Sequence, residues 1–432
     1  MITGTKGSPS LKQKLFAFQT LDSRGIPTIT AVLKTKTNTF TATVPAGTSS
    51  GVFEAVELRD GGKAFNGKGV SKACHNISRI AEKLNLSTFY LNQEKLDSFL
   101  LAIDSTPNKS KLGANTLLAI SLVAAKAAAA QKNLELFQYI SQLAHSAPNA
   151  MRLPIPMSNL INGGKHGAAN TAIQEFMVVP IGAKSFFECV ELVTEIDFAL
   201  RELIIKKFGA GGTSVGYEGG FTPHVKSSIQ ALELIQSVID RAGHSKKVKL
   251  ALDCAASEFY NSKTSKYNFE GKPLSSSKLT DVYLSLMHDF DIFSIEDPFD
   301  QNDWHSFTEF TSVAKKQHTQ VVGDDLLVTN SGRIMRGVIS EACNAVILKP
   351  NQIGTVTETI EAAQIAQAAN WNLVASHRSG DSEDSFLADF AVGLDCQFAK
   401  IGAPARGERT AKYNRLLMIE ELYGLKLAKP RF

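Results

Sequence analysis

The chain has 432 residues, of which 44% are hydrophobic and 20% are charged, and its formal net charge at pH 7 is +4. This length exceeds that of a typical single domain, so we expect one large and one smaller domain. The basic residues are dispersed along the chain, which argues against nucleic-acid binding and is compatible with a small anionic substrate.

Five cysteines are scattered along the chain without a C-x-x-C motif. Their odd number and spacing argue against a disulfide framework and against a zinc site, so we expect reduced thiols in a cytosolic protein. The first residues contain no apolar stretch of signal-peptide length, and the most apolar later stretch, residues 116–130, is interrupted by Ser121 and Lys126. We therefore expect no leader and no membrane span.

Three predicted strands lie near the N-terminus, at residues 15–19, 28–34 and 39–44. The turn sequences DSRG and TNT separate them, which indicates an antiparallel meander. The next segment is PAGTSSG, residues 45–51, whose small residues favour a loop. That loop is either an ordinary connector or a mobile segment that offers hydroxyl and backbone groups to an anion or a metal.

The pattern over residues 54–142 predicts helices, including an Ala- and Leu-rich scaffold helix over residues 113–132. Within this region GGKAFNGKG nearly matches a phosphate-binding loop. We reject that interpretation because Gly69 stands where the motif needs Ser or Thr and because no strand precedes it. The best domain boundary lies near residues 144–152. It divides the chain into a smaller α+β domain, residues 1–145, and a larger domain, residues 146–432.

The second domain begins with a predicted Gly-rich loop and a strand. The loop NGGKHG carries His166, and the strand AIQEFMVVPI contains Gln174 and Glu175. Helices are predicted over residues 186–207 and 227–242. Between them, VGYEGGFTP places Glu218 among glycines, where an acid is more often a turn residue than a catalyst.

Between Val248 and Gly402, short apolar runs recur and each stops on a polar or charged residue. The residues that end the runs are Asp253, Glu296, Asp324, Lys349, His377 and Lys400. Amphipathic segments of helical periodicity separate the runs, which indicates repeated β-α units closing into a β/α barrel. In such a barrel the C-terminal strand ends converge on one face, so these six side chains are predicted to share a pocket.

A single charged residue after a strand is usually a loop residue or a helix N-cap, but six in register favour a functional site. Hard dications bind carboxylate oxygens, so we interpret Asp253, Glu296 and Asp324 as one metal site. Asp297 and Asp325, each the second acid of its pair, are interpreted as helix caps or as residues that support the metal ligands.

Together these segments resemble enolase over nearly the whole chain, in the order and at spacings compatible with that family. The matching words are DSRGIPT, PAGTSSGVFEAVELRD, NKSKLGAN, NGGKH with QEFM, GYEGGFTP, LDCAASEFY, SIEDPF, GDDLLVTN, LKPNQIGT, SHRSGDSED and KIGAPARGER with AKYN. The resemblance implies an α/β fold, with a smaller α+β domain capping a C-terminal β/α (TIM-like) barrel, and a homodimer.

The resemblance also implies an activity, a phosphopyruvate hydratase that interconverts 2-phosphoglycerate and phosphoenolpyruvate with two Mg²⁺ ions. Lys349 matches the base and Glu218 the acid, while Glu175 matches a second catalytic carboxylate that also contacts substrate. Asp253, Glu296 and Asp324 match the ligands of the tighter ion, and Ser49 matches a lid residue that joins the second ion and the substrate. The remaining matches are to loop and substrate-binding positions: His166, His377, Arg378, Ser379 and Lys400.

Two residues near these positions differ from the family's usual wording. Tyr217 precedes the acid where Asp is customary, and Lys165 replaces a small residue beside His166. Two alternatives stay open. One is another member of the superfamily, such as an acid-sugar dehydratase or racemase, which NGGKH, GYEGG and SHRSG disfavour. The other is a catalytically weakened relative that serves as a structural or surface-binding protein, which Tyr217 keeps open.

Overall fold

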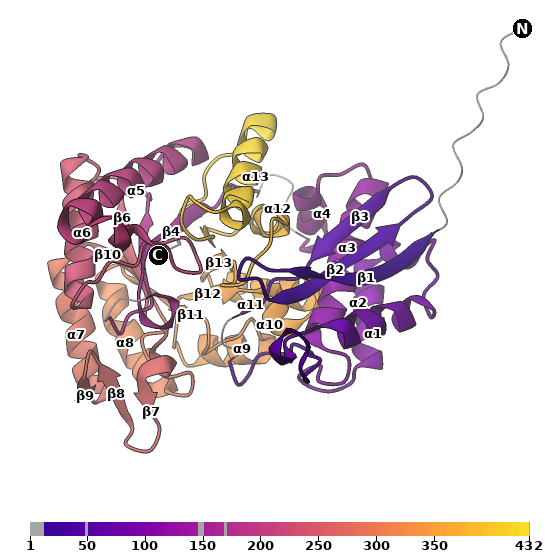
Figure 1. Ribbon diagram of the computed structural model, residues 1–432, viewed down its shortest axis with the longest axis horizontal. Coiled ribbons are helices and arrows are strands. Elements are labelled where there is room, and N and C mark those ends of the chain that lie inside the picture. Colours follow the sequence, from indigo (N-terminus) through magenta and orange to yellow (C-terminus); the bar gives the residue numbers. More distant parts are fainter. Residues whose placement is uncertain (1–12, 48–50, 146–150, 168–170, 432) are drawn as a thin grey trace, which may run out of the picture.

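The computed structural model describes residues 13–47, 51–145, 151–167 and 171–431. A closed eight-stranded barrel surrounded by helices forms the larger part, and a three-stranded sheet with four helices packs beside it (Figure 1). The predicted α/β class with a C-terminal barrel is confirmed. The predicted division at residues 145/146 falls at the edge of residues 146–150, which lie outside the described part of the chain.

The N-terminal sheet is the predicted antiparallel meander. Its strands are β1 (Lys14–Leu21), β2 (Pro27–Lys34) and β3 (Thr39–Thr43), with β2 in the centre. Four helices follow: α1 (Ser71–Ala81), α2 (Gln93–Ile103), α3 (Ala114–Gln131) and α4 (Leu136–Leu143). The prediction of helix from residue 54 onward is wrong for residues 54–70, where only a short 3-10 turn, Ala64–Gly67, occurs.

The barrel strands close in the order β10-β11-β12-β13-β14-β4-β5-β6. Their bounds are β4 (Ile155–Asn162), β5 (Glu175–Val179), β6 (Lys249–Asp253), β10 (Ile292–Glu296), β11 (Gln320–Gly323), β12 (Ala345–Leu348), β13 (Asn372–Ser376) and β14 (Phe398–Lys400). Each of the six predicted apolar runs forms one of these strands, so the residues that end the runs lie at or directly after a strand's C-terminal end.

One strand departs from the expected parallel pattern. β5 runs antiparallel to both neighbours, β4 and β6. The reason is the connection from β4, because its described residues, 163–167 and 171–174, contain no crossover helix and a parallel pair requires one. As a consequence, the first residue of β5, Glu175, lies at the same barrel end as the last residue of β6, Asp253, with which it pairs.

The helices that cover the barrel are α5 (Phe186–Phe208), α6 (Ser228–Arg241), α7 (Ser276–Asp289), α8 (Trp304–Lys316), α9 (Ser331–Ile339), α10 (Pro350–Ile353), α11 (Val356–Ala368), α12 (Phe386–Gly393) and α13 (Gly407–Tyr423). A small sheet of β7 (Tyr260–Asn261), β8 (Lys266–Phe269) and β9 (Lys272–Leu274) follows β6. Several helices begin at a polar cap. For example, the Ser185 hydroxyl accepts the backbone N–H of Glu188, 3.0 Å away, and thereby satisfies a free donor of the first turn of α5.

Two apolar regions form the core. Inside the barrel, side chains such as Met157, Val322 and Ile347 are completely buried, and the rings of Phe293 and Phe398 pack 5.4 Å apart. The larger region fills the space between strands and helices and continues into the N-terminal domain around α3. Among the described helices, α3 alone is long and apolar enough to cross a membrane, but 83% of it is buried inside this protein. It is therefore a core helix.

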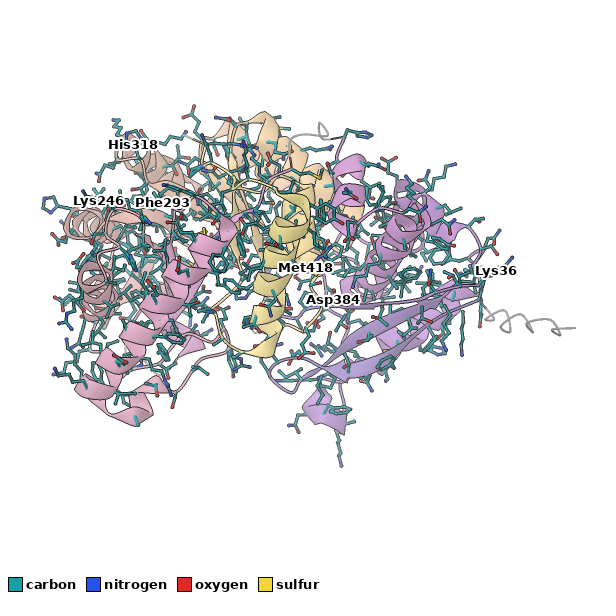
Figure 2. All side chains as sticks on the ribbon, turned by 90° about the horizontal axis from the view of Figure 1, so that it is seen from above. Lys36, Lys246, Phe293, His318, Asp384 and Met418 are labelled. Atoms are coloured by element: carbon teal, nitrogen blue, oxygen red, sulfur yellow. The ribbon has the colours of Figure 1, made fainter. Side chains whose placement is uncertain are left out.

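Polar contacts join the smaller domain to the barrel. Lys126 of α3 donates to Asp384, 2.7 Å away, and Asp384 lies between the N-terminal sheet and the C-terminal helices (Figure 2). Deeper in the interface, the completely buried Asp97 of α2 accepts the backbone N–H of Thr357 at 3.0 Å and its hydroxyl at 2.7 Å. Asp97 thus caps the first turn of α11 from the other domain.

We predict that Asp97→Ala lowers the free energy of unfolding by about 2 kcal/mol, because it leaves buried donors of α11 without an acceptor. Urea and thermal unfolding measure this change. The matched control is Glu94→Ala, which removes an exposed acid from the same helix and should shift the midpoint little. Equal midpoints for the two variants would contradict the capping role of Asp97.

Candidate active site

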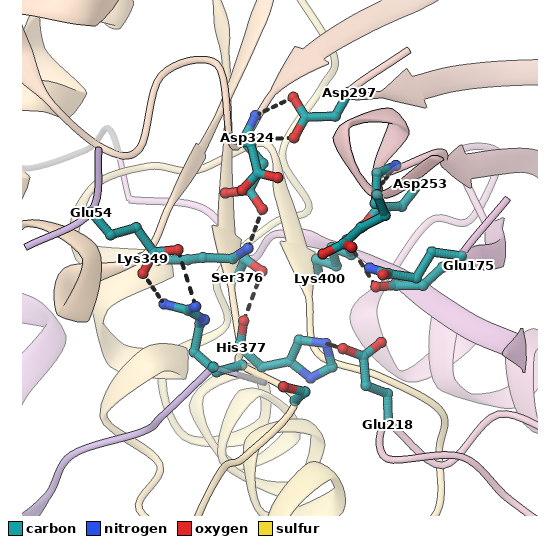
Figure 3. Close-up of a pocket in the computed structure, with 17 residues that line it drawn as sticks. Glu54, Glu175, Glu218, Asp253, Asp297, Asp324, Lys349, Ser376, His377 and Lys400 are labelled. Atoms are coloured by element: carbon teal, nitrogen blue, oxygen red, sulfur yellow. Dashed lines mark hydrogen bonds and ion pairs between the residues drawn. The ribbon is translucent and has the colours of Figure 1, made fainter. Parts of the chain in front are cut away.

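One cavity at the C-terminal end of the barrel collects most of the predicted site residues (Figure 3). Its volume is about 550 Å³ including its open mouth. The predicted residues that line it are Glu175, Glu218, Asp253, Asp324, Lys349, His377, Arg378, Ser379 and Lys400. Glu296 is completely buried beneath this lining and touches it through Lys400. The sequence-based grouping of these side chains is therefore reproduced by the fold.

The structure does not describe the side chains of two predicted residues. Ser49 belongs to residues 48–50, which are not described, and His166 is described only in its backbone, within the 3-10 turn Gly164–His166. The neighbouring Lys165 forms an ion pair with Glu258, which lines the cavity. The predicted roles of Ser49 and His166 stay predictions.

Lys400, the last residue of β14, lies among three carboxylates. Its Nζ is 2.7 Å from Asp253 Oδ2, 2.9 Å from Glu296 Oε2 and 3.2 Å from Glu175 Oε1. The strand register explains this cluster, because Glu175, Asp253 and Glu296 occupy matching positions on the adjacent strands β5, β6 and β10. The three acids consequently form one continuous row.

Lys349 directly follows β12 and pairs with Asp324, which directly follows β11. The other oxygen of Asp324 accepts an N–H from Gln352, 2.9 Å away. The loop that carries Asp324 is fixed by Asp297, whose carboxylate accepts the backbone N–H groups of Asp324 at 3.0 Å and Asp325 at 2.7 Å. This contact agrees with the interpretation of Asp297 as a supporting residue.

The pKa values of these acids are shifted in different directions, upward by burial and neighbouring acids and downward by a neighbouring lysine. Burial, reinforced by Glu218, raises the pKa of Glu175 well above its usual range, and burial with the charge of Asp253 does the same for Glu296. Asp324 behaves differently: although burial opposes ionisation, its pKa is lowered because Lys349 lies beside it. Burial and the charge of Asp324 raise the pKa of Asp325 to about 7.

The two lysines remain protonated in this arrangement. Burial acts to lower the pKa of Lys349, but the charge of Asp324 outweighs it and the pKa is raised. For Lys400, burial is likewise outweighed by Asp253 and Glu175, and its pKa is raised well above the usual value. Arg378 and Lys400 also act to lower the pKa of Lys349, but the carboxylate of Asp324 beside it outweighs them.

Glu218 faces the row of acids from the glycine-containing loop after α5. The amide Nδ2 of Asn159 donates to Glu218 Oε2 at 3.1 Å, and Nε2 of His377 lies 3.6 Å from Glu218 Oε1 (Figure 3). Glu218 is 3% exposed, so this acid lies inside the site, whereas a solvated turn residue would not be buried to this degree.

The sequence analysis missed several residues that hold the site together. Asn159 contacts Glu218 and Gln352 contacts Asp324, as described above. Glu54, from the smaller domain, accepts two hydrogen bonds from the guanidinium of Arg378, at 3.1 Å and 3.3 Å. Glu54 lies in the segment PAGTSSGVFEAVELRD, which resembles the enolase family, so the sequence indicates weakly that it has a role. Its partner Arg378 is distant in sequence and could not be inferred.

The composition of the cavity fits a site that holds cations. Among the described residues, eight carboxyl-bearing side chains line it and only three cationic ones, Lys349, Arg378 and Lys400, do so. An anionic substrate cannot enter such a cavity unless additional positive charge compensates the excess of acids. Asp297, Asp324 and Asp325 bring carboxylate oxygens within 4.8 Å of one another, and oxygen donors of this kind suit Mg²⁺. Metal ligation by Asp253, Glu296 and Asp324 stays a prediction.

An eight-stranded barrel with carboxylates and lysines gathered at its C-terminal strand ends is the architecture of the β/α-barrel enzymes, whose active sites lie at that face. The comparison with protein families agrees. Residues 13–140 match the model described as the enolase N-terminal domain, and residues 150–428 match the enolase C-terminal TIM barrel domain. The chain belongs to the enolase family, whose members generally use a divalent metal.

We predict that Mg²⁺ raises the melting temperature of the purified protein. At a concentration about 100 times its Kd, a ligand that binds only the folded state stabilises it by about 2.7 kcal/mol, which shifts the midpoint by several degrees. Differential scanning fluorimetry with Mg²⁺ and with EDTA measures the shift.

The variant Asp324→Asn should lose most of this shift, because it removes a charged oxygen from the cavity. The control Asp281→Asn removes an exposed acid that pairs only with Lys278 on the barrel's outside, and it should keep the full shift. A shift of equal size in both variants would exclude Asp324 as a ligand.

Proposed function

We propose that the protein catalyses the reversible dehydration of 2-phospho-D-glycerate to phosphoenolpyruvate, as a hydro-lyase of glycolysis and gluconeogenesis. The observation that carries the proposal is the placement of an amine and an acid across one cavity. Lys349 follows β12, whereas Glu218 lies on the loop that pairs with β4, on another side of the barrel mouth (Figure 3). Between them lies the row formed by Glu175, Asp253 and Glu296, with Lys400.

The reaction needs a base of this kind and a low-dielectric site. A proton beside a carboxylate is very weakly acidic, because its removal adds charge to a group that is already negative. Lys349 removes this proton once Asp324 no longer pairs with it and its amine is neutral. Asp253, Glu296 and Asp324 would hold one Mg²⁺ ion and Ser49 would join a second, and the bound ions would supply Lewis-acid stabilisation of the charge on the substrate carboxylate.

The departure of hydroxide needs an acid on the other side of the substrate. Glu218 supplies the proton, and Glu175 assists it as the second carboxylate. Burial raises the pKa of Glu175, which keeps a proton available beside Glu218. Lys400, His377, Arg378 and Ser379 bind the anionic substrate, and the loops that carry Ser49 and His166 close over it to exclude water.

Tyr217 does not obstruct this chemistry. It is 41% exposed and lines an outer cavity beside Arg24 and Arg59, not the cavity that contains Lys349. Its backbone oxygen accepts an N–H from Arg409 at 2.9 Å, a contact that any residue at this position can make. This location supports an active enzyme over a weakened structural relative.

We predict that the purified protein converts 2-phosphoglycerate in the presence of Mg²⁺, measured by the ultraviolet absorbance of phosphoenolpyruvate, and that EDTA stops the reaction. Lys349→Ala should lower kcat by about 10³-fold or more, because it removes the only proposed base. The variant should keep the Mg²⁺-dependent thermal shift, since the oxygen ligands remain.

Each outcome of this assay has a distinct meaning. Unchanged turnover of Lys349→Ala would remove that residue from its role. An inactive wild-type protein that still shows the Mg²⁺ shift would favour the weakened structural relative. Turnover of acid sugars in place of 2-phosphoglycerate would favour another superfamily dehydratase.

We further propose a cytosolic homodimer without nucleic-acid or membrane partners. Support comes from apolar side chains exposed on the packed helices α5 and α13, with Phe187 and Leu422 each 64% exposed and Phe198 63% exposed. A second copy of the chain would bury such side chains. Light scattering coupled to size-exclusion chromatography should give twice the mass of the 46.7 kDa chain, and a monomer mass at micromolar concentration would reject the dimer.

A further inference from the structure

Arg409 is a fully buried arginine that no part of the proposed reaction uses. It lies in the first turn of α13, is 0% exposed, and is the bulkiest of the completely buried side chains among the described residues. Burying a guanidinium is costly unless its N–H groups are all directed at acceptors. Its contacts therefore indicate what it is for.

The guanidinium joins two loops of the active site. Nη2 donates to the backbone oxygens of Tyr217 at 2.9 Å and Ser379 at 2.8 Å, and Nη1 donates to the backbone oxygen of Arg378 at 2.7 Å. The first of these carbonyls precedes the proposed acid Glu218, in the loop that we call the acid loop. The other two belong to residues 377–380, which we call the substrate-binding segment. Arg409 thus holds the acid loop and the substrate-binding segment at a fixed separation.

The fourth contact is to a side chain. Arg409 Nη1 lies 2.7 Å from Nδ1 of His377. A guanidinium is always protonated and can only donate, so Nδ1 must be the acceptor and must carry no proton. The neutral ring of His377 therefore carries its single proton on the other nitrogen, Nε2.

That nitrogen faces Glu218 within the lining of the active-site cavity (Figure 3). Nε2 is buried, and the nearest carboxylate oxygen, on Glu218, is 3.6 Å away, beyond normal hydrogen-bond length. Among the described residues, Nε2 has no closer acceptor. A buried N–H group without an acceptor at hydrogen-bond distance, in the lining of a cavity, can donate to an oxygen of a bound ligand.

The backbone nearby is shaped to allow this approach. Gly402 has φ of +81°, and a Cβ atom there would lie 2.9 Å from Arg409 Cδ and 3.0 Å from His377 Cε1. Any side chain at this position would push the guanidinium and the imidazole apart or clash with both, so only glycine fits.

We propose that Arg409 is a positioning residue that fixes His377 as the neutral tautomer protonated on Nε2, so that His377 is a permanent hydrogen-bond donor to an oxygen of the bound anionic substrate. In this role His377 neither takes nor gives a proton. The identity of the substrate rests on the proposed function, whereas the tautomer is a property of the protein alone.

The electrostatics around His377 agree with a neutral ring. The charged groups that face it are Arg409 on α13, Glu218 on the acid loop and Asp381 on its own loop. Burial, together with the charge of Arg409, lowers the pKa of His377 to about 4, and these effects outweigh Glu218 and Asp381. Asp381 is itself engaged by Lys412 at 2.8 Å.

Nuclear magnetic resonance on the full-length protein tests the tautomer directly. Protein labelled with ¹⁵N-histidine gives long-range ¹H–¹⁵N correlations that distinguish the two neutral tautomers from imidazolium, and His377→Gln assigns the signal. We expect the Nε2-protonated form, without titration, from about pH 5 to about pH 8. A signal from the Nδ1-protonated form, or an imidazolium titrating in that range, would overturn the proposal even if the protein has no activity on 2-phosphoglycerate.

Arg409→Met tests the cause. It should release His377 into a mixture of tautomers that titrates, and it should lower kcat/KM by about ten- to hundredfold, the equivalent of one lost charge-assisted hydrogen bond. The matched control is Arg415→Met, which removes a partly buried arginine of α13 that contacts Asp389 and Glu135. This control should lose stability but keep the wild-type His377 signal. An unchanged His377 signal in a folded Arg409→Met protein would reject the role of Arg409.

His377→Gln tests whether His377 acts as a hydrogen-bond donor or as an acid or base. This test can be made even if Arg409→Met does not fold. A glutamine amide can donate from a similar position but cannot exchange protons near neutral pH. We expect kcat/KM to fall by about tenfold while its pH profile keeps the wild-type shape. The disappearance of one limb of that profile would show that His377 titrates during catalysis and would contradict the proposal.

Discussion

The structure depends on the compensation of negative charge in a place that excludes water. Glu175, Asp253 and Glu296 lie side by side at the mouth of the barrel, and the ammonium group of Lys400 contacts all three. Carboxylates at such distances in a medium of low dielectric constant cannot all stay ionised without counter-ions. Burial, reinforced by the neighbouring acids, raises the pKa values of Glu175 and Glu296. The charge balance of this site is therefore incomplete without a bound cation.

The barrel provides this crowding at little conformational cost, because each of these charged groups is carried by the end of a strand whose remaining residues are mostly buried and apolar. The antiparallel direction of β5 contributes to this crowding of acids. A parallel β5 would place its last residue, Val179, at the mouth; the antiparallel strand places Glu175 there instead, beside Asp253.

Much of the fold and of the site was predictable because strand ends are a local property of the sequence. Asp253, Glu296, Asp324, Lys349, His377 and Lys400 each follow an apolar run, and the barrel geometry brings such ends together. The supporting residues carry no local signal. Glu54 and Arg378 are 324 positions apart, and Asn159 and Glu218 are 59 apart, so only the folded chain reveals these pairs. The helical interpretation of residues 54–70 fails for a related reason: this segment bonds to distant groups, such as the backbone of Gln352, and cannot satisfy its own.

The smaller domain contributes to the site, although none of its described residues is a proposed catalyst. Glu54 holds the guanidinium of Arg378 with two hydrogen bonds. The segment after β3 is bonded to the substrate-binding segment, since the backbone groups of Ala46 and Gly380 pair with each other in an isolated bridge at 2.7 Å and 2.9 Å. Gly380 directly follows Ser379, whose backbone oxygen is held by Arg409. One continuous chain of hydrogen bonds therefore links the loop of the smaller domain, the substrate-binding segment and the acid loop. A displacement of the smaller domain would be transmitted to His377 and Glu218, which explains why a barrel with its own core is tied so firmly, through Asp97 and Lys126, to its neighbour.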